Sequence, residues 1–212
     1  MKLQVALDFT DLDQALAVAS TVAPHAEWLE AGTLLVKSRG MAAVSALRAH
    51  FPGHTIVADL KTADGGRKET DMAFAAGADV STVLGLVPDR SIAECLEAAT
   101  HRGRTVFVDL LGCAEPRWAE LARLGASHVI YHIGKDEQGE RALRSDVLHR
   151  LQEDWGFTVA VAGGITTEMA RALVPAGPAV VIVGAGVTLA ADPAAAAHAI
   201  RDVLDAPALH RE

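Results

Sequence analysis

The sequence predicts an α/β protein with the architecture of a (β/α)8 TIM barrel, formed as a single domain over residues 1–212. Short runs rich in Val, Ile and Leu alternate with stretches of helical period, which indicates parallel strands joined by helical crossovers. Eight such repeats of about 26 residues each follow one another, and eight strand–helix units are what a closed barrel requires. An open doubly wound sheet is the alternative, but it usually has fewer strands.

The expected strands are short and apolar, and the expected helices carry apolar residues at helical spacing. Strands are expected at 3–8, 28–31, 55–61, 80–84, 105–110, 128–133, 158–162 and 179–183. Helices are expected at 13–22, 41–50, 69–76, 91–101, 117–124, 141–155, 168–174 and 193–204. Glycines after several helices, such as Gly77 and Gly125, are typical of helix ends.

Composition excludes several function classes. The net charge of −8 disfavours a nucleic-acid partner, because such binding needs clustered Lys and Arg. No apolar run approaches the roughly 18 residues of a membrane span, and early acidic residues argue against a signal peptide. The two cysteines, Cys95 and Cys113, match no metal-binding or disulfide pattern, which favours a reducing compartment. We expect a cytoplasmic protein without a membrane partner.

Polar residues and glycines stand at the carboxyl ends of most expected strands, where barrels build their active sites. They are Asp8, Glu30, Asp59 with Lys61, Asp109, His132, Gly163-Gly164 and Gly184-Ala185-Gly186. Because strand side chains alternate, Asp59 and Lys61 are expected on one face, and Asp64 follows in the next loop. A lysine beside a carboxylate can stabilise a developing oxyanion. The alternative is an ion pair that only orders the loop.

Three further patterns suggest ligands for this rim. Glu30 and Asp59 are hard oxygen donors on neighbouring strands, which suits Mg²⁺, whereas no His/Cys cluster suits zinc. His132 is the one histidine expected at the carboxyl end of a strand, so a functional role is favoured over a structural one. The glycine loops after the last two strands, each before a helix, are typical of phosphate binding, although a tight turn also uses glycine.

Several motifs resemble the orotidine 5′-phosphate decarboxylase suprafamily. Asp59-x-Lys61-x-x-Asp64 in VADLKTADGG resembles its signature. KLQVALD, LEAGT, AGAD followed by STVLG, and VAVAGGI are similar to the branch of 3-hexulose-6-phosphate synthase and 3-keto-L-gulonate-6-phosphate decarboxylase. The resemblance implies a (β/α)8 barrel, a homodimer with active sites at the subunit interface, Mg²⁺ as cofactor, and a 1,2-enediolate formed from a pentulose 5-phosphate.

The resemblance also assigns roles to individual residues. Glu30 and Asp59 match the metal ligands, Lys61 the cation beside the enediolate, and Asp8 the carboxylate that contacts substrate hydroxyls. Asp64 matches the aspartate that reaches the partner's site, and His132 the proton-handling histidine. Gly164, Gly184 and Ala185 match the loops that hold the phosphate, and Lys135 stands where the decarboxylase pattern has an arginine.

The resemblance leaves two reactions open. The synthase adds formaldehyde to ribulose 5-phosphate, whereas the decarboxylase releases CO2 from a β-keto acid. Ala162 and Ala185, with the H-x-G-x-D-x-Q pattern that begins at His132, favour the synthase. Tyr131-His132, GTLLV and Trp155-Gly156-Phe157 are more similar to the decarboxylase.

The segment after the third expected strand carries two consecutive cations, Arg67 and Lys68. They either begin a solvated helix or attract an anionic substrate.

An alternative to an enzyme is a barrel that binds a sugar phosphate without catalysis. The intact set of charged strand ends argues against it, since a binder has no need of a lysine among carboxylates.

Overall fold

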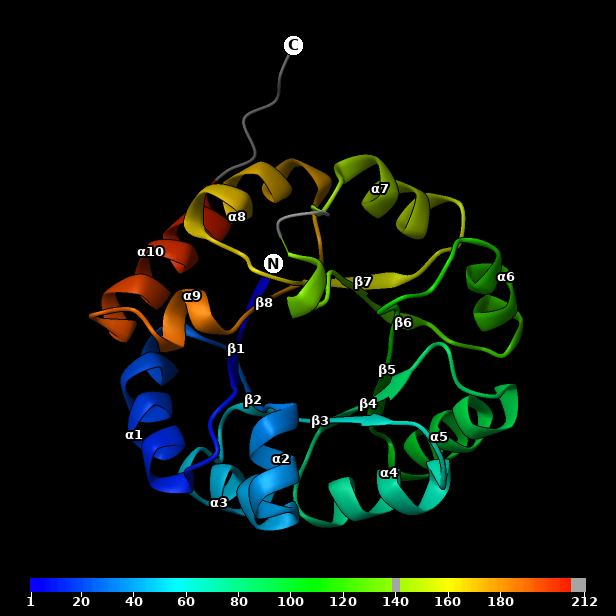
Figure 1. Ribbon diagram of the computed structural model, residues 1–212, viewed down its shortest axis with the longest axis horizontal. Coiled ribbons are helices and arrows are strands. Elements are labelled where there is room, and N and C mark those ends of the chain that lie inside the picture. Colours follow the sequence, from blue (N-terminus) through cyan, green and yellow to red (C-terminus); the bar gives the residue numbers. More distant parts are fainter. Residues whose placement is uncertain (139–141, 207–212) are drawn as a thin grey trace.

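Eight parallel strands close into a barrel in the order β1-β2-β3-β4-β5-β6-β7-β8, as the sequence predicts. The computed structural model describes residues 1–138 and 142–206. Figure 1 looks into the barrel, with the strands around the centre and the helices in an outer ring. All strands run the same way, so their carboxyl ends meet at one mouth.

The elements follow the predicted alternation closely. The strands are β1 (Lys2–Leu7), β2 (Trp28–Ala31), β3 (Thr55–Thr62), β4 (Val80–Leu84), β5 (Thr105–Asp109), β6 (His128–His132), β7 (Thr158–Ala162) and β8 (Val180–Val183). The main helices are α1 (Leu12–Val22), α3 (Met41–His50), α4 (Gly66–Ala75), α5 (Asp89–Arg102), α6 (Pro116–Arg123), α7 (Ser145–Glu153), α8 (Thr167–Leu173) and α10 (Pro193–Asp205). Short 3-10 helices are η1 (Ala23–His25), η2 (Lys135–Glu137) and η3 (Val174–Ala176).

Two short helices at the barrel mouth were not predicted. They are α2 (Thr33–Arg39) and α9 (Ala185–Thr188), which follow β2 and β8 directly. At seven and four residues they are too short to show a helical period. The helix predicted at 141–155 is shorter in the structure, where α7 is Ser145–Glu153, and residue 141 lies outside the described residues.

The apolar residues form two layers that explain where the polar ones gather. A large cluster packs the outer faces of the strands against the helices. A smaller cluster fills the barrel itself and contains Ala6, Val57, Val80, Phe107, Ile130, Ala160, Ala162, Val180 and Ile182. Trp28 packs edge-on against Phe107, and Phe107 against His128, near the amino ends of the strands. The inward-facing carboxyl groups of Glu30, Asp59 and Asp109 lie beyond this layer, toward the carboxyl ends of their strands.

Ion pairs close the amino-terminal end of the barrel. Asp79, just before β4, accepts from both Arg48 and Arg104 and from the Ile56 backbone N–H at 2.9 Å. Glu27, just before β2, accepts from Arg201 at 2.9 Å. These contacts tie helices to the loops that enter the strands.

None of the helices in the described part of the chain is long and apolar enough to span a membrane.

Candidate active site

The end of β3 departs from regular strand geometry. The pairing of β3 with β4 shifts register between Ala58 and Thr62, and Lys61 has a φ of 45°. Lys61 is the only non-glycine residue with positive φ in residues 1–138 and 142–206. For an L-residue this conformation costs on the order of 1–2 kcal/mol. The backbone at Lys61 is therefore irregular, but the side chains of Asp59 and Lys61 meet on one side of the strand, as predicted.

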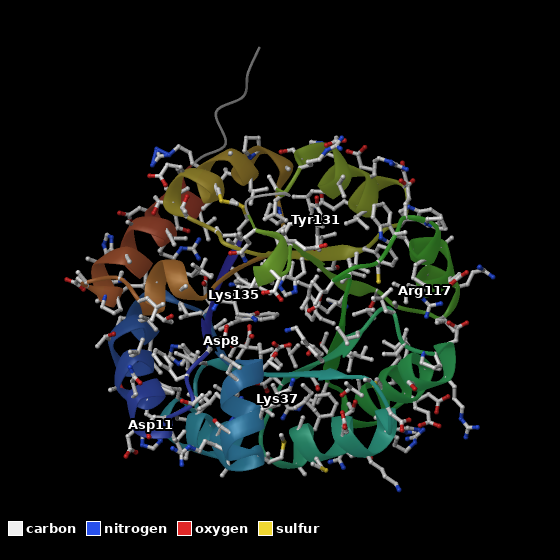
Figure 2. All side chains as sticks on the ribbon, in the orientation of Figure 1. Asp8, Asp11, Lys37, Arg117, Tyr131 and Lys135 are labelled. Carbon is white, nitrogen blue, oxygen red and sulfur yellow. The ribbon has the colours of Figure 1, made fainter. Side chains whose placement is uncertain are left out.

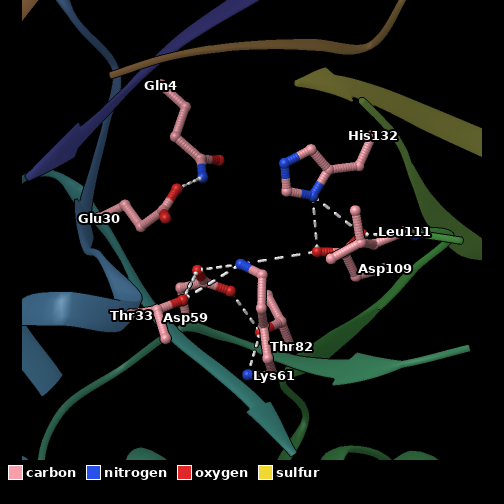
Figure 3. Close-up of polar contacts among 9 residues, drawn as sticks. All are labelled: Gln4, Glu30, Thr33, Asp59, Lys61, Thr82, Asp109, Leu111 and His132. Atoms are coloured by element: carbon pink, nitrogen blue, oxygen red, sulfur yellow. Dashed lines mark hydrogen bonds and ion pairs between the residues drawn. The ribbon is translucent and has the colours of Figure 1, made fainter. Parts of the chain in front are cut away.

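The Lys61 ammonium lies between two carboxylates (Figure 3). It donates to Asp59 Oδ2, lies 3.2 Å from Thr33 Oγ1, and is 3.6 Å from Asp109 Oδ2. Burial by itself would lower the pKa of Lys61, but the negative charges of Asp59, Asp109 and Glu30 outweigh it and raise that pKa. Lys61 therefore stays charged.

Asp59 is a buried carboxylate with several donors. Thr33 Oγ1 donates to its Oδ2 at 2.5 Å, and Thr82 Oγ1 donates to its Oδ1 at 2.7 Å. Burial alone would raise the pKa of Asp59, but Lys61 and the two hydroxyls favour the charged form and lower it. Asp59 is thus held ionised and in a fixed orientation.

Glu30 and Asp8 have the opposite electrostatic environment. Glu30 is 6% exposed and accepts from the Gln4 side-chain amide inside the barrel. Burial, and then the negative charge of Asp59, raise the pKa of Glu30 well above its usual range and raise that of Asp8 as well. The two groups therefore lie in a field where a cation would be favourable.

Gly32 allows Asp8 to approach α2. A Cβ at Gly32 would lie 2.3 Å from Asp8 Oδ1, so no other residue fits there without movement. Asp8 also accepts from the Leu34 backbone N–H in the first turn of α2. Since Thr33 of the same turn contacts Asp59, the unpredicted helix α2 connects two carboxylates of the site.

His132 at the end of β6 is oriented by Asp109 at the end of β5. Its Nδ1 lies 2.9 Å and 3.1 Å from the two Asp109 oxygens, and the Leu111 backbone N–H donates to Asp109 Oδ1 at 2.9 Å. Asp109 is fully buried. A carboxylate on Nδ1 favours the tautomer with its proton there, which leaves Nε2 facing the barrel centre in Figure 3.

The other predicted site residues lie around this cluster. Gly164 has a φ of 61°, Ala185 begins α9, and Gly184 precedes it. Lys135 in η2 lies over the mouth near Asp8, whose pKa its positive charge partly lowers (Figure 2). Asp64 is exposed on the loop after β3 and is not part of the Lys61 cluster.

Arg67 has a partner away from the mouth. Its Nη2 lies 2.6 Å from Glu97 Oε2 of α5, in an exposed ion pair, and Lys68 is exposed at the start of α4. This arrangement favours the interpretation as a solvated helix start.

Four residues of the site had no role assigned from the sequence: Gln4, Thr33, Thr82 and Asp109. For Asp109, the position at the end of an expected strand is the sequence feature that could have indicated a role in the site. Gln4, Thr33 and Thr82 are ordinary polar residues in the sequence, and only their contacts in the fold place them in the site.

Comparisons with known proteins agree with this geometry. The model of the family described as "Orotidine 5'-phosphate decarboxylase / HUMPS family" matches residues 1–200 of this chain. The 3-hexulose-6-phosphate synthase of Mycobacterium gastri is 38% identical over 95% of this chain and 98% of its own. The crystal structure of 3-hexulose-6-phosphate synthase from Salmonella typhimurium superposes with a TM-score of 0.92 at 36% identity, covering 96% of this chain and 98% of that one.

The related decarboxylase is also similar. The 3-keto-L-gulonate-6-phosphate decarboxylase of Vibrio cholerae has a TM-score of 0.85 and 32% identity, and the match covers 96% of this chain and 97% of that one. The resemblance and the barrel fold predicted from the sequence are confirmed. This chain belongs to the orotidine 5′-phosphate decarboxylase / HUMPS family.

Proposed function

We propose that this protein is a magnesium-dependent aldehyde-lyase that adds formaldehyde to ribulose 5-phosphate, as the name 3-hexulose-6-phosphate synthase implies. The observation that carries the proposal is the Lys61 ammonium, held between Asp59 and Asp109 at the barrel mouth, with Asp109 also contacting His132. A fixed cation there is suited to a reaction that develops negative charge on a substrate oxygen.

The chemistry follows from the orientation of two side chains. His132 Nε2 takes the proton from the carbon next to the substrate carbonyl, and the Asp109 carboxylate stabilises the resulting imidazolium. Lys61 stabilises the enediolate oxygen that becomes negative. The carbon of the enediolate then attacks formaldehyde, a carbon–carbon bond forms, and His132 returns the proton to the new hydroxyl oxygen.

Glu30 and Asp59 are the residues that would hold Mg²⁺. Both are buried carboxyls, and the pKa of Glu30 is raised by burial and by the charge of Asp59, so a divalent cation there would relieve their repulsion. Two protein carboxylates are typical for Mg²⁺, with water and substrate completing the shell. When bound, the ion supplies positive charge to the substrate's adjacent oxygens.

The substrate phosphate is assigned to the loops at Gly164, Gly184 and Ala185. The backbone N–H groups there precede or begin α8 and α9, and no arginine is present in the last loop, so the phosphate is held mainly by backbone dipoles. Asp8 would contact substrate hydroxyls from the end of β1, and Lys135 would add a positive charge from η2.

Decarboxylation of 3-keto-L-gulonate 6-phosphate is the second candidate. The synthases match at higher sequence identity than the Vibrio cholerae decarboxylase, 38% and 36% against 32%. Ala162 and Ala185 stand where the decarboxylase pattern has a threonine and an arginine. Both observations favour the synthase. Binding without catalysis leaves the Lys61–Asp109–His132 arrangement without a purpose.

The proposal includes a homodimer in which Asp64 of one subunit reaches the site of the other. Asp64 is exposed on the loop after β3. Three of the large exposed apolar residues belong to three successive strand–helix units: Leu34 is in α2, Met72 in α4 and Leu86 in the loop after β4. Exposed apolar residues of this size are typical of a surface that another subunit covers. A cytoplasmic location is also proposed, since Cys95 and Cys113 are free.

The activity test measures formaldehyde loss. The protein is incubated with ribulose 5-phosphate, formaldehyde and Mg²⁺, and we expect consumption that requires the sugar phosphate. If formaldehyde is not consumed and CO2 is released from 3-keto-L-gulonate 6-phosphate, the decarboxylase replaces the synthase. Binding of pentulose phosphates without either turnover would leave a non-catalytic barrel.

Mixing two inactive variants tests the shared site. In a mixed dimer of Asp64→Asn and Lys61→Ala subunits, one site receives both intact residues if Asp64 acts across the interface. Random mixing then restores about a quarter of wild-type activity, and each variant alone stays inactive. No recovery in dimers shown to have exchanged subunits would place Asp64 outside the partner's site.

A further inference from the structure

The unusual backbone at Lys61 requires a stabilising contact. Its φ of 45° lies in the left-handed region, and the β3–β4 register shift between Ala58 and Thr62 removes the regular strand partner at this point. A buried backbone N–H without a partner is strongly unfavourable. The Lys61 N–H finds its acceptor in a side chain, Thr82 Oγ1, at 2.9 Å.

The same hydroxyl serves Asp59. Thr82 lies in the middle of β4, is 3% exposed, and donates its proton to Asp59 Oδ1 at 2.7 Å. A hydroxyl can accept and donate at once. One oxygen atom therefore links the backbone that carries the lysine to the carboxylate that the Lys61 ammonium contacts (Figure 3).

We propose that Thr82 is a positioning residue for this site. It does not need to touch the substrate; it fixes the direction of the Lys61 side chain and the orientation of Asp59 through a single hydroxyl. The proposal rests on the proposed function for its kinetic consequences. Its geometric consequence, a Lys61 backbone that depends on the Thr82 hydroxyl, does not depend on which reaction the protein catalyses.

The same strand pair contains a matched control. Thr62 is also a buried threonine, 1% exposed, but its Oγ1 has no hydrogen-bond partner in the described part of the chain. Thr62→Val and Thr82→Val thus make the same chemical change, the first at an unpaired hydroxyl and the second at a hydroxyl with two partners. Ser81, whose Oγ is likewise buried without a partner among the described residues, provides Ser81→Ala as a second control.

The kinetic experiment compares these variants with Thr82→Ser, which keeps the hydroxyl. We expect Thr82→Val to lower kcat about 100-fold, as a small misplacement of a reacting group does, with KM changed by less than about threefold. Thr82→Ser is expected to recover most of the loss, and Thr62→Val and Ser81→Ala to keep wild-type kcat. Equal loss in Thr82→Val and Thr62→Val, or no rescue by serine, would overturn the proposal.

A crystal structure of Thr82→Val separates this proposal from the proposed function and from a loss of folding. We expect the Leu60–Lys61 peptide to rotate and the ammonium to leave Asp59. An unchanged Lys61 φ and an intact contact with Asp59 would overturn the positioning role, whatever the activity. If wild-type protein turns over neither sugar phosphate, the proposed function fails while this structural comparison still decides the role of Thr82.

Discussion

The carboxylates at the two ends of the barrel differ in how many positively charged side chains they contact. At the amino-terminal end, Asp79 contacts two arginines, Arg48 and Arg104, and Glu27 contacts Arg201 and Lys2. At the mouth, the acidic groups on the strands or directly after them are Asp8, Glu30, Asp59 and Asp109. Within residues 1–138 and 142–206, Lys61 is the only lysine or arginine that forms an ion pair with any of these four.

This difference separates a structural end from a chemical one. A carboxylate with two cations and a backbone donor has its charge balanced and holds loops together. Four acidic groups that share one ion-paired ammonium leave a field that still favours positive charge. Burial first, and this negative field second, raise the pKa values of Glu30 and Asp8. We expect substitutions at the mouth to change activity and those at the other end to change stability.

The largest effect is expected for Lys61→Ala. Removing the ammonium takes away the group that stabilises the developing oxyanion, which is expected to reduce kcat by about 1,000-fold. The fold should be retained, because Asp59 keeps its hydroxyl donors Thr33 and Thr82. Steady-state kinetics and circular dichroism measure the two properties. A folded Lys61→Ala variant with normal kcat would remove Lys61 from the mechanism.

Asp109→Asn is expected to have the next effect. An amide in place of the carboxylate can no longer stabilise an imidazolium through His132 Nδ1, so we expect kcat to fall about 100-fold. Asp109→Glu keeps the negative charge, so it is the control that separates the loss of charge from other effects of changing this residue. If the amide variant retained full activity, His132 would not act as a base oriented by Asp109.

The residues at the barrel mouth could be predicted from the sequence, because the carboxyl ends of the strands in a barrel converge whatever the conformation of the loops. Asp59, Lys61 and His132 stand at such ends, and the structure brings them into one cluster with Asp109. The sequence was not sufficient for Thr82, because its bond with the Lys61 backbone N–H forms in the stretch where β3 shifts register against β4, and a shift of this kind is not visible in the sequence. Helix α2 was missed because seven residues carry too little periodicity, although its first turn contacts both Asp8 and Asp59.

Arg48→Ala tests the structural end. The Arg48 guanidinium donates to Asp79 and to three backbone carbonyls, those of Gly77, Pro52 and His54. Because the pair is partly exposed, we expect a loss of about 2 kcal/mol in the free energy of unfolding, or roughly 4–8 °C in Tm. Denaturant unfolding and kcat are measured together, and kcat should be unchanged.

A matched control for that variant is Arg90→Ala, which removes an ion pair with Glu94 in which the arginine side chain is 90% exposed. We expect its stability to stay within about 0.5 kcal/mol of wild type. A fall in kcat for Arg48→Ala at a temperature where the protein is folded would show that the two ends are not independent.

The smallest predicted effect tests the unbalanced charge at the mouth most directly. Mg²⁺ at ten times its dissociation constant is expected to stabilise the folded protein by about 1.4 kcal/mol, or roughly 3–5 °C in Tm. Glu30→Gln removes one proposed ligand while the Gln4 amide still has an oxygen to donate to, so the variant should fold and lose this shift. Arg48→Ala should keep it, since its carboxylate partner lies at the other end. The Tm shift in KCl at the same ionic strength measures how much of the Mg²⁺ effect comes from general charge screening. An equal Mg²⁺ shift in wild type and Glu30→Gln would mean that the excess negative charge of the mouth is not neutralised at Glu30, and the assignment of the metal ligands would have to change.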